Sequence, residues 1–425
     1  MDVVSLGCRL NAYEGEAIRA QLAAQNLHDV IVVNTCAVTA EAEKQARQTI
    51  RRLRRQHPAA RLVVTGCAAQ VAPERFAAMT EVDHVLGNRE KLEATQWRDL
   101  GKARVSVGDI MTDAPPAAFD GTGSVESGPA VNGFPGRPRA YLEIQQGCDH
   151  RCTFCIIPYG RGPSRSLPLG AVAEQARLLA RQGYREFVLT GVDITSYGHD
   201  LPGRPSLGQA ARRLLALVPD IQRLRFSSLD PAEIDDDLLL LLRDEPRVMP
   251  HLHLSLQAGD DLILKRMKRR HSRDQALRMA EKLHQLRPGL ALGADLIAGF
   301  PTEDEAAFQR SAALINEIGL AYLHVFPFSP RQGTPAARMP QVPQAEIRAR
   351  AAELRRLGSA GLDRFLTGRV GSLASILVEQ DGLGRDETYA PVALPPAQIT
   401  GYAKGAIFNG RIGAARDGKL WLEAA

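Results

Sequence analysis

The sequence contains no long hydrophobic run and few cysteines, and both shortages narrow the possible classes of protein. No uninterrupted apolar stretch reaches about 18 residues, so we expect no transmembrane helix. The first residues, MDVVSLGCRLNAYEGE, lack a basic segment followed by a long apolar core, which predicts no signal peptide and a cytoplasmic location. Six cysteines in 425 residues do not indicate a disulfide scaffold, because the cytosol keeps thiols reduced.

The chain also lacks a strong excess of either charge. It has 53 Lys and Arg residues against 48 Asp and Glu residues, a formal net charge of +5. That balance permits a nucleic-acid partner but does not require one. Hydrophobic residues make up 44% and charged residues 24%, which argues against a largely disordered or collagen-like chain. The length predicts about three domains.

Short β-rich runs alternate with helical stretches in the first region of the chain. The elements expected within residues 1–111 are strands at 3–6, 30–34, 61–65 and 84–86 and helices at 14–25, 40–55 and 73–79. This alternation predicts an α/β domain with a parallel, flavodoxin- or Rossmann-like sheet covered by helices. Residues 112–138 are rich in Pro, Gly, Ser and Ala, which predicts an interdomain linker.

Two further domains are expected after the linker. Residues 139–365 contain six strand–helix units, with strands at 141–145, 187–190, 224–227, 251–256, 290–297 and 322–326. This pattern predicts a partial, open (β/α)6 relative of the (β/α)8 barrel, with ligands at the C-terminal ends of its strands. Residues 366–425 contain short strands separated by Gly and Asp turns, which predicts a small antiparallel β-barrel.

Three of the cysteines form a compact motif. Cys148, Cys152 and Cys155 have the spacing C-x3-C-x2-C and directly follow a predicted strand. Three thiolates on one short loop can ligate three irons of a 4Fe–4S cluster and leave the fourth iron open. The alternative is a zinc site, which would need a fourth protein ligand; His150 is available but lies inside the loop.

This motif resembles the cluster loop of the radical S-adenosylmethionine (SAM) enzymes. In that family the open iron is chelated by the amino and carboxylate groups of SAM, and an electron from the cluster yields a 5′-deoxyadenosyl radical. The resemblance implies a SAM site at the strand ends, formed by Phe154, Gly191, Asp193, Arg225, Ser227, Ser228, Gln257, Ile297 and Gly299. For each of these residues alone, the alternative is ordinary barrel packing.

The other three cysteines lie far apart, yet each follows a predicted strand. The C-terminal ends of parallel strands meet at one edge of a sheet, so we expect Cys8, Cys36 and Cys67 to gather in one crevice and hold a second 4Fe–4S cluster. Gly7 and Gly66 would let the backbone approach it closely. Three ligands again leave an iron open, which suggests that an external atom such as sulfur binds there. The alternative is three small buried hydrophobic side chains.

Taken together, these features resemble the radical SAM tRNA methylthiotransferases over essentially the whole chain. The motifs that carry the resemblance are G-C-R-L-N-x-Y-E, N-T-C-A-V-T, T-G-C and C-D-H-R-C-T-F-C-I-I-P-Y-G-R-G. The terminal barrel is similar to the RNA-binding TRAM module of that family. The residues around Cys8 and Cys36 are similar to the branch that acts on threonylcarbamoyladenosine.

The resemblance implies a reaction and a set of partners. A methylthio group is added to C2 of a modified adenosine next to the anticodon, with one SAM supplying the methyl group and a second supplying the radical. The implied partners are the tRNA anticodon stem-loop, an external electron donor and a sulfur source, and no membrane. The alternatives are the same chemistry on isopentenyladenosine in tRNA or on a ribosomal protein aspartate, and, in another class, a non-catalytic RNA-binding iron–sulfur sensor.

Two basic clusters are candidates for RNA contact. Arg51 and Arg55 share one face of the helix expected at 40–55, where an ordinary solvated face is the alternative. The run at 265–270 is denser and follows the fourth barrel strand. We expect Lys268 or Arg269 in this run to meet the anticodon loop.

Overall fold

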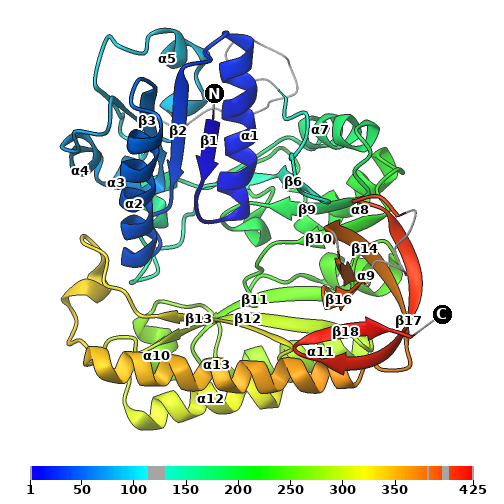
Figure 1. Cartoon of the computed structure of the whole chain (residues 1–425). Helices are drawn as coiled ribbons and strands as arrows, with labels where there is room; N and C mark the ends of the chain where they lie inside the picture. The colour runs from blue at the N-terminus through cyan, green and yellow to red at the C-terminus, as the bar shows by residue number, and fades with distance from the viewer. Residues whose placement is uncertain (1, 113–129, 381, 395–401, 424–425) are drawn as a thin grey trace.

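The chain folds into three regions that contact one another. The computed structural model describes residues 2–112, 130–380, 382–394 and 402–423. Figure 1 shows the N-terminal α/β region beside a central barrel-like region, with a small β-barrel, coloured red, at the opposite end of the central strands. The predicted α/β fold with a parallel sheet, a partial barrel and a terminal barrel is confirmed.

The N-terminal sheet has five parallel strands. They are β1 (Asp2–Ser5), β2 (Val30–Thr35), β3 (Arg61–Gly66), β4 (His84–Leu86) and β5 (Val105–Ser106). All six residues of β2 are buried, as expected for a parallel strand whose sheet is covered on both faces. The strands follow one another in chain order, so this sheet, over its described strands, lacks the order reversal of Rossmann and flavodoxin-like sheets.

Helices cover both faces of this sheet. They are α1 (Arg9–Ala24), α2 (Ala40–Gln56), α3 (Cys67–Val71), α4 (Pro73–Ala77) and α5 (Ala94–Arg98), with a short 3-10 turn, η1 (Glu90–Leu92). Ile18 of α1 packs with Val32 on one face, and Ile50 of α2 packs with Val33 on the other. Helix α1 begins at Arg9, earlier than predicted, because Cys8 is in the extended conformation that caps a helix start.

The central region is a partial barrel made of two three-stranded parallel sheets. One contains β6 (Ala140–Glu143), β9 (Glu186–Thr190) and β10 (Arg223–Phe226), and the other β11 (His251–Gln257), β12 (Ala291–Ala298) and β13 (Tyr322–Pro327). Single bridges, Leu224 to Val248 and Leu229 to Leu254, join the two sheets. The six predicted strands are therefore present in the predicted order, but only isolated bridges, and no continuous ladder, join β10 to β11.

Helices alternate with the strands of the central region along the chain. They are α6 (Ile157–Arg161), α7 (Leu169–Arg181), α8 (Leu207–Leu217), α9 (Asp236–Asp244), α10 (Asp261–Arg266), α11 (Arg273–Leu286), α12 (Glu305–Ile318) and α13 (Gln344–Thr367). Helix α6, after the cysteine loop, packs on α3 of the N-terminal region. Ser206 and Ser272 start α8 and α11 with capping boxes. Within the described parts of the chain, no helix combines the length and the apolarity needed to cross a membrane.

The strands of the partial barrel have an apolar outer face and a polar inner face. Leu224, Leu252 and Leu292 belong to the large hydrophobic core that the helices share. The alternating side chains on the inner face are polar or aromatic and include Glu186, Arg223, Arg225, His251, His253, Asp295, Tyr322 and His324. The barrel interior is therefore built for a polar ligand rather than for a dry core.

The N-terminal region closes the open side of the barrel. Tyr13 of α1 belongs to the same core as Tyr141 of β6, and Phe134 packs against both rings. Val131 and Phe134 are buried, so the end of the predicted linker at 112–138 forms part of this core. Residues 113–129 of that segment lie outside the described residues.

The C-terminal region is a closed five-stranded barrel in the order β14-β15-β16-β18-β17. The strands are β14 (Leu373–Gln380), β15 (Leu383–Asp386), β16 (Pro391–Ala393), β17 (Ile407–Arg416) and β18 (Lys419–Leu422). The pairing is antiparallel, as predicted, except that β16 and β18 run parallel. Strand β15 occupies a stretch in which Gly382, Gly384 and Asp386 favour a turn by composition.

Candidate active site

The loop that carries Cys148, Cys152 and Cys155 leaves the end of the β6 side of the barrel and is held by backbone hydrogen bonds. The Cys148 amide donates to the carbonyl of Gly162 (3.1 Å), and the Cys155 amide donates to the carbonyl of Cys152 (3.1 Å). The Thr153 amide donates to the carbonyl of Met267 (3.1 Å), which ties the loop to the end of α10. The three thiols are therefore presented together at the C-terminal ends of the barrel strands, as predicted from their spacing.

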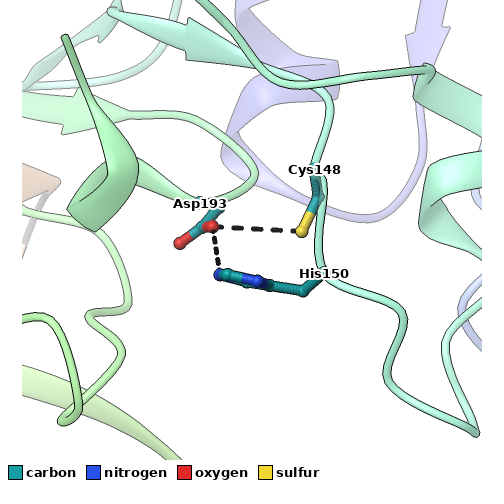
Figure 2. A group of neighbouring side chains, drawn as sticks. All are labelled: Cys148, His150 and Asp193. Carbon is teal, nitrogen blue, oxygen red and sulfur yellow. Dashed lines mark hydrogen bonds and ion pairs between the residues drawn. The ribbon is translucent and has the colours of Figure 1, made fainter. Parts of the chain in front are cut away.

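Cys148 lies beside a buried carboxylate and a histidine (Figure 2). His150 Nε2 lies 2.9 Å from Asp193 Oδ2, and the Cys148 sulfur lies 3.9 Å from the same oxygen. Hydrogen bonds to Asp193 and Glu233 raise the pKa of His150 to about 10. His150 is thus held by Asp193 next to the cysteine loop.

Cys8, Cys36 and Cys67 lie at the ends of three neighbouring strands. Ser5 of β1 pairs with Asn34 of β2, which pairs with Thr65 of β3, and each cysteine follows its strand by one to three residues. After burial, the negative charge of Cys67 is among the causes that raise the pKa of Cys36 to about 11 and that raise the pKa of Cys8. The predicted gathering of these three thiols is thus present in the fold.

Gly7 and Gly66, the two glycines singled out in the sequence, lie at tightly packed positions beside the second trio. A Cβ atom at Gly7 would lie 2.9 Å from the Cys36 sulfur, and one at Gly66 would lie 2.4 Å from the backbone nitrogen of Thr35. Both glycines have φ near +95°, a conformation that other residues rarely adopt. The absence of a side chain at both positions therefore permits close packing of the backbone beside Cys36 and Thr35.

The two cysteine trios face the same interface. Helix α3, which begins at Cys67, packs on α6, which follows the C-x3-C-x2-C loop. A Cβ at Gly160 of α6 would lie 3.2 Å from the Cβ of Cys67. Cys67 is also among the charges that raise the pKa of Cys155, after burial as the largest cause. The contact between α3 and α6 thus joins the ends of the two predicted metal sites.

A cavity of about 190 Å³ opens next to this interface. Its walls come from the segment after Cys36, from the cysteine loop and from the ends of β11, β12 and β13. The lining residues are Val38, Thr39, Phe154, Gln257, Asp295, Ile297, Phe326, Pro327, Phe328 and Ser329. Three of the residues predicted to contact SAM, Phe154, Gln257 and Ile297, therefore lie on one cavity wall.

The other predicted SAM-contact residues are mostly at the same ends of the strands. Gly191 follows β9, and the backbone amides of Val192 and Asp193 donate to Gln145 Oε1 (3.0 and 2.8 Å). Ser227 and Ser228 follow β10, and Ser228 is exposed. Gly299 follows β12 with φ of +72°, where a Cβ would collide with Ile347.

Arg225 lies elsewhere than its sequence position suggested. Its guanidinium contacts Glu186 (2.9 Å) and donates to the carbonyls of Asp386 and Glu387 (3.0 and 3.1 Å) in the terminal barrel. It also lies 5.0 Å from the centre of the Tyr389 ring. These contacts are directed at the terminal barrel rather than at the cysteine loop, so we leave Arg225 out of the candidate SAM site.

The four residues predicted to contact RNA differ in exposure. Arg269 is engaged inside the site: its guanidinium lies 3.8 Å from the Cys152 sulfur, donates to the Ser255 carbonyl (2.7 Å) and pairs with Asp230 (3.0 Å). With a side chain 8% exposed, Arg269 is not available to a phosphate on the surface. Lys268, Arg51 and Arg55 are exposed, and Arg51 lies 3.7 Å from Glu81.

Sequence reasoning did not bring together the members of two polar clusters, the first of which lies at the cavity. His253, Asp295 and His324 stand on β11, β12 and β13, with Asp295 Oδ1 accepting from His253 (2.8 Å) and His324 (3.2 Å). The second is a buried ion cluster of Glu14, Lys91 and Arg161 beneath Cys8 and Cys67. The period-two placement of polar residues on the barrel strands was a signal for the first, whereas long sequence separation hid the second.

The fold and the cysteine loop together define a radical SAM protein. Residues 142–315 match the radical SAM superfamily, and residues 1–87 match a family described as uncharacterized protein family UPF0004. Among solved structures, the radical SAM methyltransferase TsrM from Kitasatospora setae has a TM-score of 0.55 at 15% identity. That match covers 79% of this chain and 74% of TsrM, and at this identity it speaks for the fold alone.

Similar proteins of known name show which group of radical SAM proteins this chain resembles. The threonylcarbamoyladenosine tRNA methylthiotransferase MtaB of Rickettsia prowazekii is 47% identical over 92% of this chain and 91% of its own length. MtaB of Bacillus subtilis is 38% identical over 79% of this chain and 74% of its own length. The tRNA-2-methylthio-N(6)-dimethylallyladenosine synthase of Erythrobacter litoralis is 34% identical over 89% of this chain and 86% of its own length. This chain belongs to the radical SAM tRNA methylthiotransferase family.

Membership supports the cofactor assignment for the first trio. Radical SAM enzymes use SAM and a 4Fe–4S cluster, and the donor set here fits that cluster: three thiols on one pinned loop, with His150 already engaged by Asp193. For the zinc alternative, His150 and Asp193 are the candidate ligands beside Cys148, and they are engaged with each other at 2.9 Å.

Proposed function

We propose that this enzyme adds a methylthio group to C2 of threonylcarbamoyladenosine next to the anticodon of tRNA, using SAM and two 4Fe–4S clusters. The observation that carries the proposal is the meeting of two cysteine trios at one interface, beside one cavity. The substrate class follows the printed names of relatives that align over most of this chain. The second cluster and the contacts described below are part of the proposal.

The first centre would be held by Cys148, Cys152 and Cys155. A bound cluster with SAM supplies a carbon radical, which can take hydrogen from an unactivated aromatic carbon that no side-chain base could deprotonate at neutral pH. Around this loop we assign SAM contacts to Phe154, Gly191, Asp193, Ser227, Ser228, Gln257, Ile297 and Gly299. Phe154 and Ile297 offer apolar surface for an adenine ring, while the glycines leave the backbone accessible to polar groups.

The second centre would be held by Cys8, Cys36 and Cys67. The three cysteines follow neighbouring strands of one parallel sheet, and the backbone at Gly7 packs directly against Cys36. The chain has six cysteines in all, so each trio takes three and neither has a fourth thiolate. An iron without a protein ligand at this second site would be the place for the sulfur atom that is transferred.

Arg9 favours the threonylcarbamoyl substrate over the dimethylallyl one. A threonyl group carries a carboxylate, whereas a dimethylallyl group is uncharged. Arg9 follows Cys8, is half-buried, and makes no side-chain hydrogen bond or ion pair with any described residue. Burial, Arg225, His253 and Arg9 hold the pKa of His251 well below its usual range, which places the Arg9 charge near the barrel interior. A free cation there suits a carboxylate on the substrate.

The RNA would approach across the rim formed by the N-terminal and central regions. Lys268, Arg51 and Arg55 are the exposed cations that we retain as phosphate contacts. We propose the domain division 1–111, 112–138, 139–365 and 366–425, with the last as a TRAM-like RNA-binding unit. An electron donor and a sulfur source are further partners that this chemistry requires.

Nucleoside mass spectrometry of total tRNA tests the proposal, using cells with and without the gene. We expect 2-methylthio-N6-threonylcarbamoyladenosine to disappear and its precursor to accumulate. The wild-type gene should restore it, and a Cys36→Ala gene should not. Loss of the methylthio group from isopentenyladenosine instead would favour that alternative, and unchanged tRNA would direct attention to a ribosomal protein. Formation of 5′-deoxyadenosine by the purified, anaerobically reduced protein would eliminate a non-catalytic sensor.

A further inference from the structure

A fully buried ion cluster lies where the N-terminal region meets the cysteine loop. Arg161 of α6 binds the Glu14 carboxylate of α1 with two nitrogens, at 2.8 and 3.0 Å. Lys91 Nζ lies 2.7 Å from the same carboxylate. The side chains of Glu14, Lys91 and Arg161 are 1%, 0% and 2% exposed. Charges this deeply buried are costly, so their surroundings must compensate them.

Each of the two cations reaches one cysteine of the N-terminal trio through an asparagine. Arg161 donates to Asn11 Oδ1 (2.6 Å), and this amide oxygen lies 3.8 Å from the Cys8 sulfur. Lys91 donates to Asn88 Oδ1 (2.6 Å), and the Asn88 amide nitrogen lies 3.7 Å from the Cys67 sulfur. The same Asn88 nitrogen also donates to the carbonyl of Gly160 on α6. The ion cluster is therefore connected by hydrogen bonds to Asn11 beside Cys8 and to Asn88 beside Cys67.

The cluster carries more positive than negative charge. Two cations share the single carboxylate of Glu14. Burial, and then the neighbouring charge of Glu14, raise the pKa of the other buried carboxyl nearby, Glu143, to about 7. Gln146 contacts both Arg161 (2.7 Å) and Glu14 (3.1 Å) but is neutral. The two basic side chains thus outnumber the one carboxylate that they contact directly.

We infer that Arg161 and Lys91 provide the counter-charge for the centre held by Cys8, Cys36 and Cys67. Arg161 comes from α6 of the central region, directly after the other cysteine loop, so the N-terminal centre is electrostatically complete only when the two regions are joined. Arg161, Lys91 and Glu14 are positioning residues in this account, because they act on the centre through Asn11 and Asn88. The inference rests on the proposed second cluster and assigns the residues that tune it.

Removing a positive charge and removing a negative charge from this ion cluster should shift the midpoint potential of the N-terminal centre in opposite directions. Net charge and hydrogen bonds near the sulfurs set the reduction potential of an iron–sulfur cluster. Arg161→Gln removes a positive charge and should lower the midpoint potential and speed the loss of iron to a chelator several-fold. Arg161→Lys should restore part of both properties. Glu14→Gln removes the only carboxylate and should raise the potential.

The experiment uses the full chain with Cys148, Cys152 and Cys155 all replaced by Ala, reconstituted anaerobically so that only the N-terminal centre is present. Midpoint potential by EPR-monitored titration and iron retention are measured with thermal stability. Arg350→Gln is the matched control, because Arg350 is also 4% exposed and pairs with Glu303 (3.0 Å), in a different part of the barrel.

The sign of the shifts decides the outcome. Opposite shifts for Arg161→Gln and Glu14→Gln, with no shift for Arg350→Gln, would support the inference. Lower thermal stability in all three variants with an unchanged potential would show that the ion cluster is structural only and would overturn it. If Arg161→Gln does not fold, Glu14→Gln still gives the sign. If the parent triple variant binds no cluster while the wild type cleaves SAM, the second cluster of the proposed function fails as well.

Discussion

The two cysteine trios each bring three thiols together, but one does so within a single loop and the other with three strands of a sheet. Cys148, Cys152 and Cys155 come from one loop whose backbone hydrogen bonds fix their positions locally. Cys8, Cys36 and Cys67 come from three strands and depend on the register of a parallel sheet. The first trio has Asp193 and Arg269 beside it, whereas the second lies over the buried cluster of Glu14, Lys91 and Arg161. The comparison teaches that the second site needs the complete fold, and the first needs mainly its loop.

The largest expected effect is the loss of both reactions from the first trio. Cys152→Ala should abolish 5′-deoxyadenosine formation and methylthiolation, because the open iron that binds SAM depends on all three thiols. Anaerobic turnover with mass spectrometry of nucleosides measures both products in one sample. Retention of SAM cleavage in correctly folded, reconstituted Cys152→Ala would break the assignment of this loop.

The matched change in the second trio should separate the two reactions. Cys36→Ala should abolish methylthiolation while 5′-deoxyadenosine formation stays within a few-fold of the wild type. The reason is that Cys36 directly follows β2 of the N-terminal sheet and is not part of the loop that carries Cys148, Cys152 and Cys155. If Cys36→Ala and Cys152→Ala behaved alike in SAM cleavage, the division between the trios would not hold.

A smaller effect, on the KM for RNA, is expected from changes to Arg9, the first residue of α1. Arg9→Gln should raise KM for threonylcarbamoyladenosine RNA about tenfold, since a charged hydrogen bond contributes ~1.5 kcal/mol or more. Arg9→Lys should fall between Arg9→Gln and the wild type, and Lys102→Gln, an exposed cation on the N-terminal region, serves as the control. Steady-state assays with anticodon stem-loop RNA give KM and kcat separately. A fall in kcat with no change in KM would place Arg9 at the metal site instead of at the substrate.

The smallest expected effect is at the surface. Lys268→Glu should weaken tRNA binding a few-fold and reduce the salt dependence of the affinity by about one charge, because Lys268 is exposed. Arg269→Gln should leave the salt dependence unchanged and instead disturb the first cluster, since Arg269 is directed at Cys152. Filter binding at several salt concentrations distinguishes the two residues. If Arg269→Gln reduced the salt dependence of tRNA binding as much as Lys268→Glu, Arg269 would be a phosphate contact after all.

The sequence predicted what depends on local pattern. The spacing of Cys148, Cys152 and Cys155 identified the loop, and the placement of Cys8, Cys36 and Cys67 after strands identified the second crevice. The parallel sheet, the six barrel strands and the terminal barrel followed from alternation and turn residues. Each of these features depends on a pattern of neighbouring residues, so it could be predicted without knowledge of distant contacts.

Features that depend on distant contacts were missed or misplaced. Arg225 has a position at a strand end that suits a cofactor contact, but Asp386 and Glu387 of the terminal barrel lie more than 150 residues away and take up its guanidinium. Arg269 sits in a basic run, yet it folds back onto Cys152. Glu14 and Arg161 are 147 residues apart, so their pairing could not be read from spacing.

Iron and sulfide analysis of the anaerobically reconstituted full chain tests the central claim most directly, when it is compared with two variants that each lack one cysteine trio. The account predicts about eight irons per wild-type chain and about four in each triple-alanine variant. About four irons in the wild type, none after loss of Cys148, Cys152 and Cys155, and no change after loss of Cys8, Cys36 and Cys67 would contradict it.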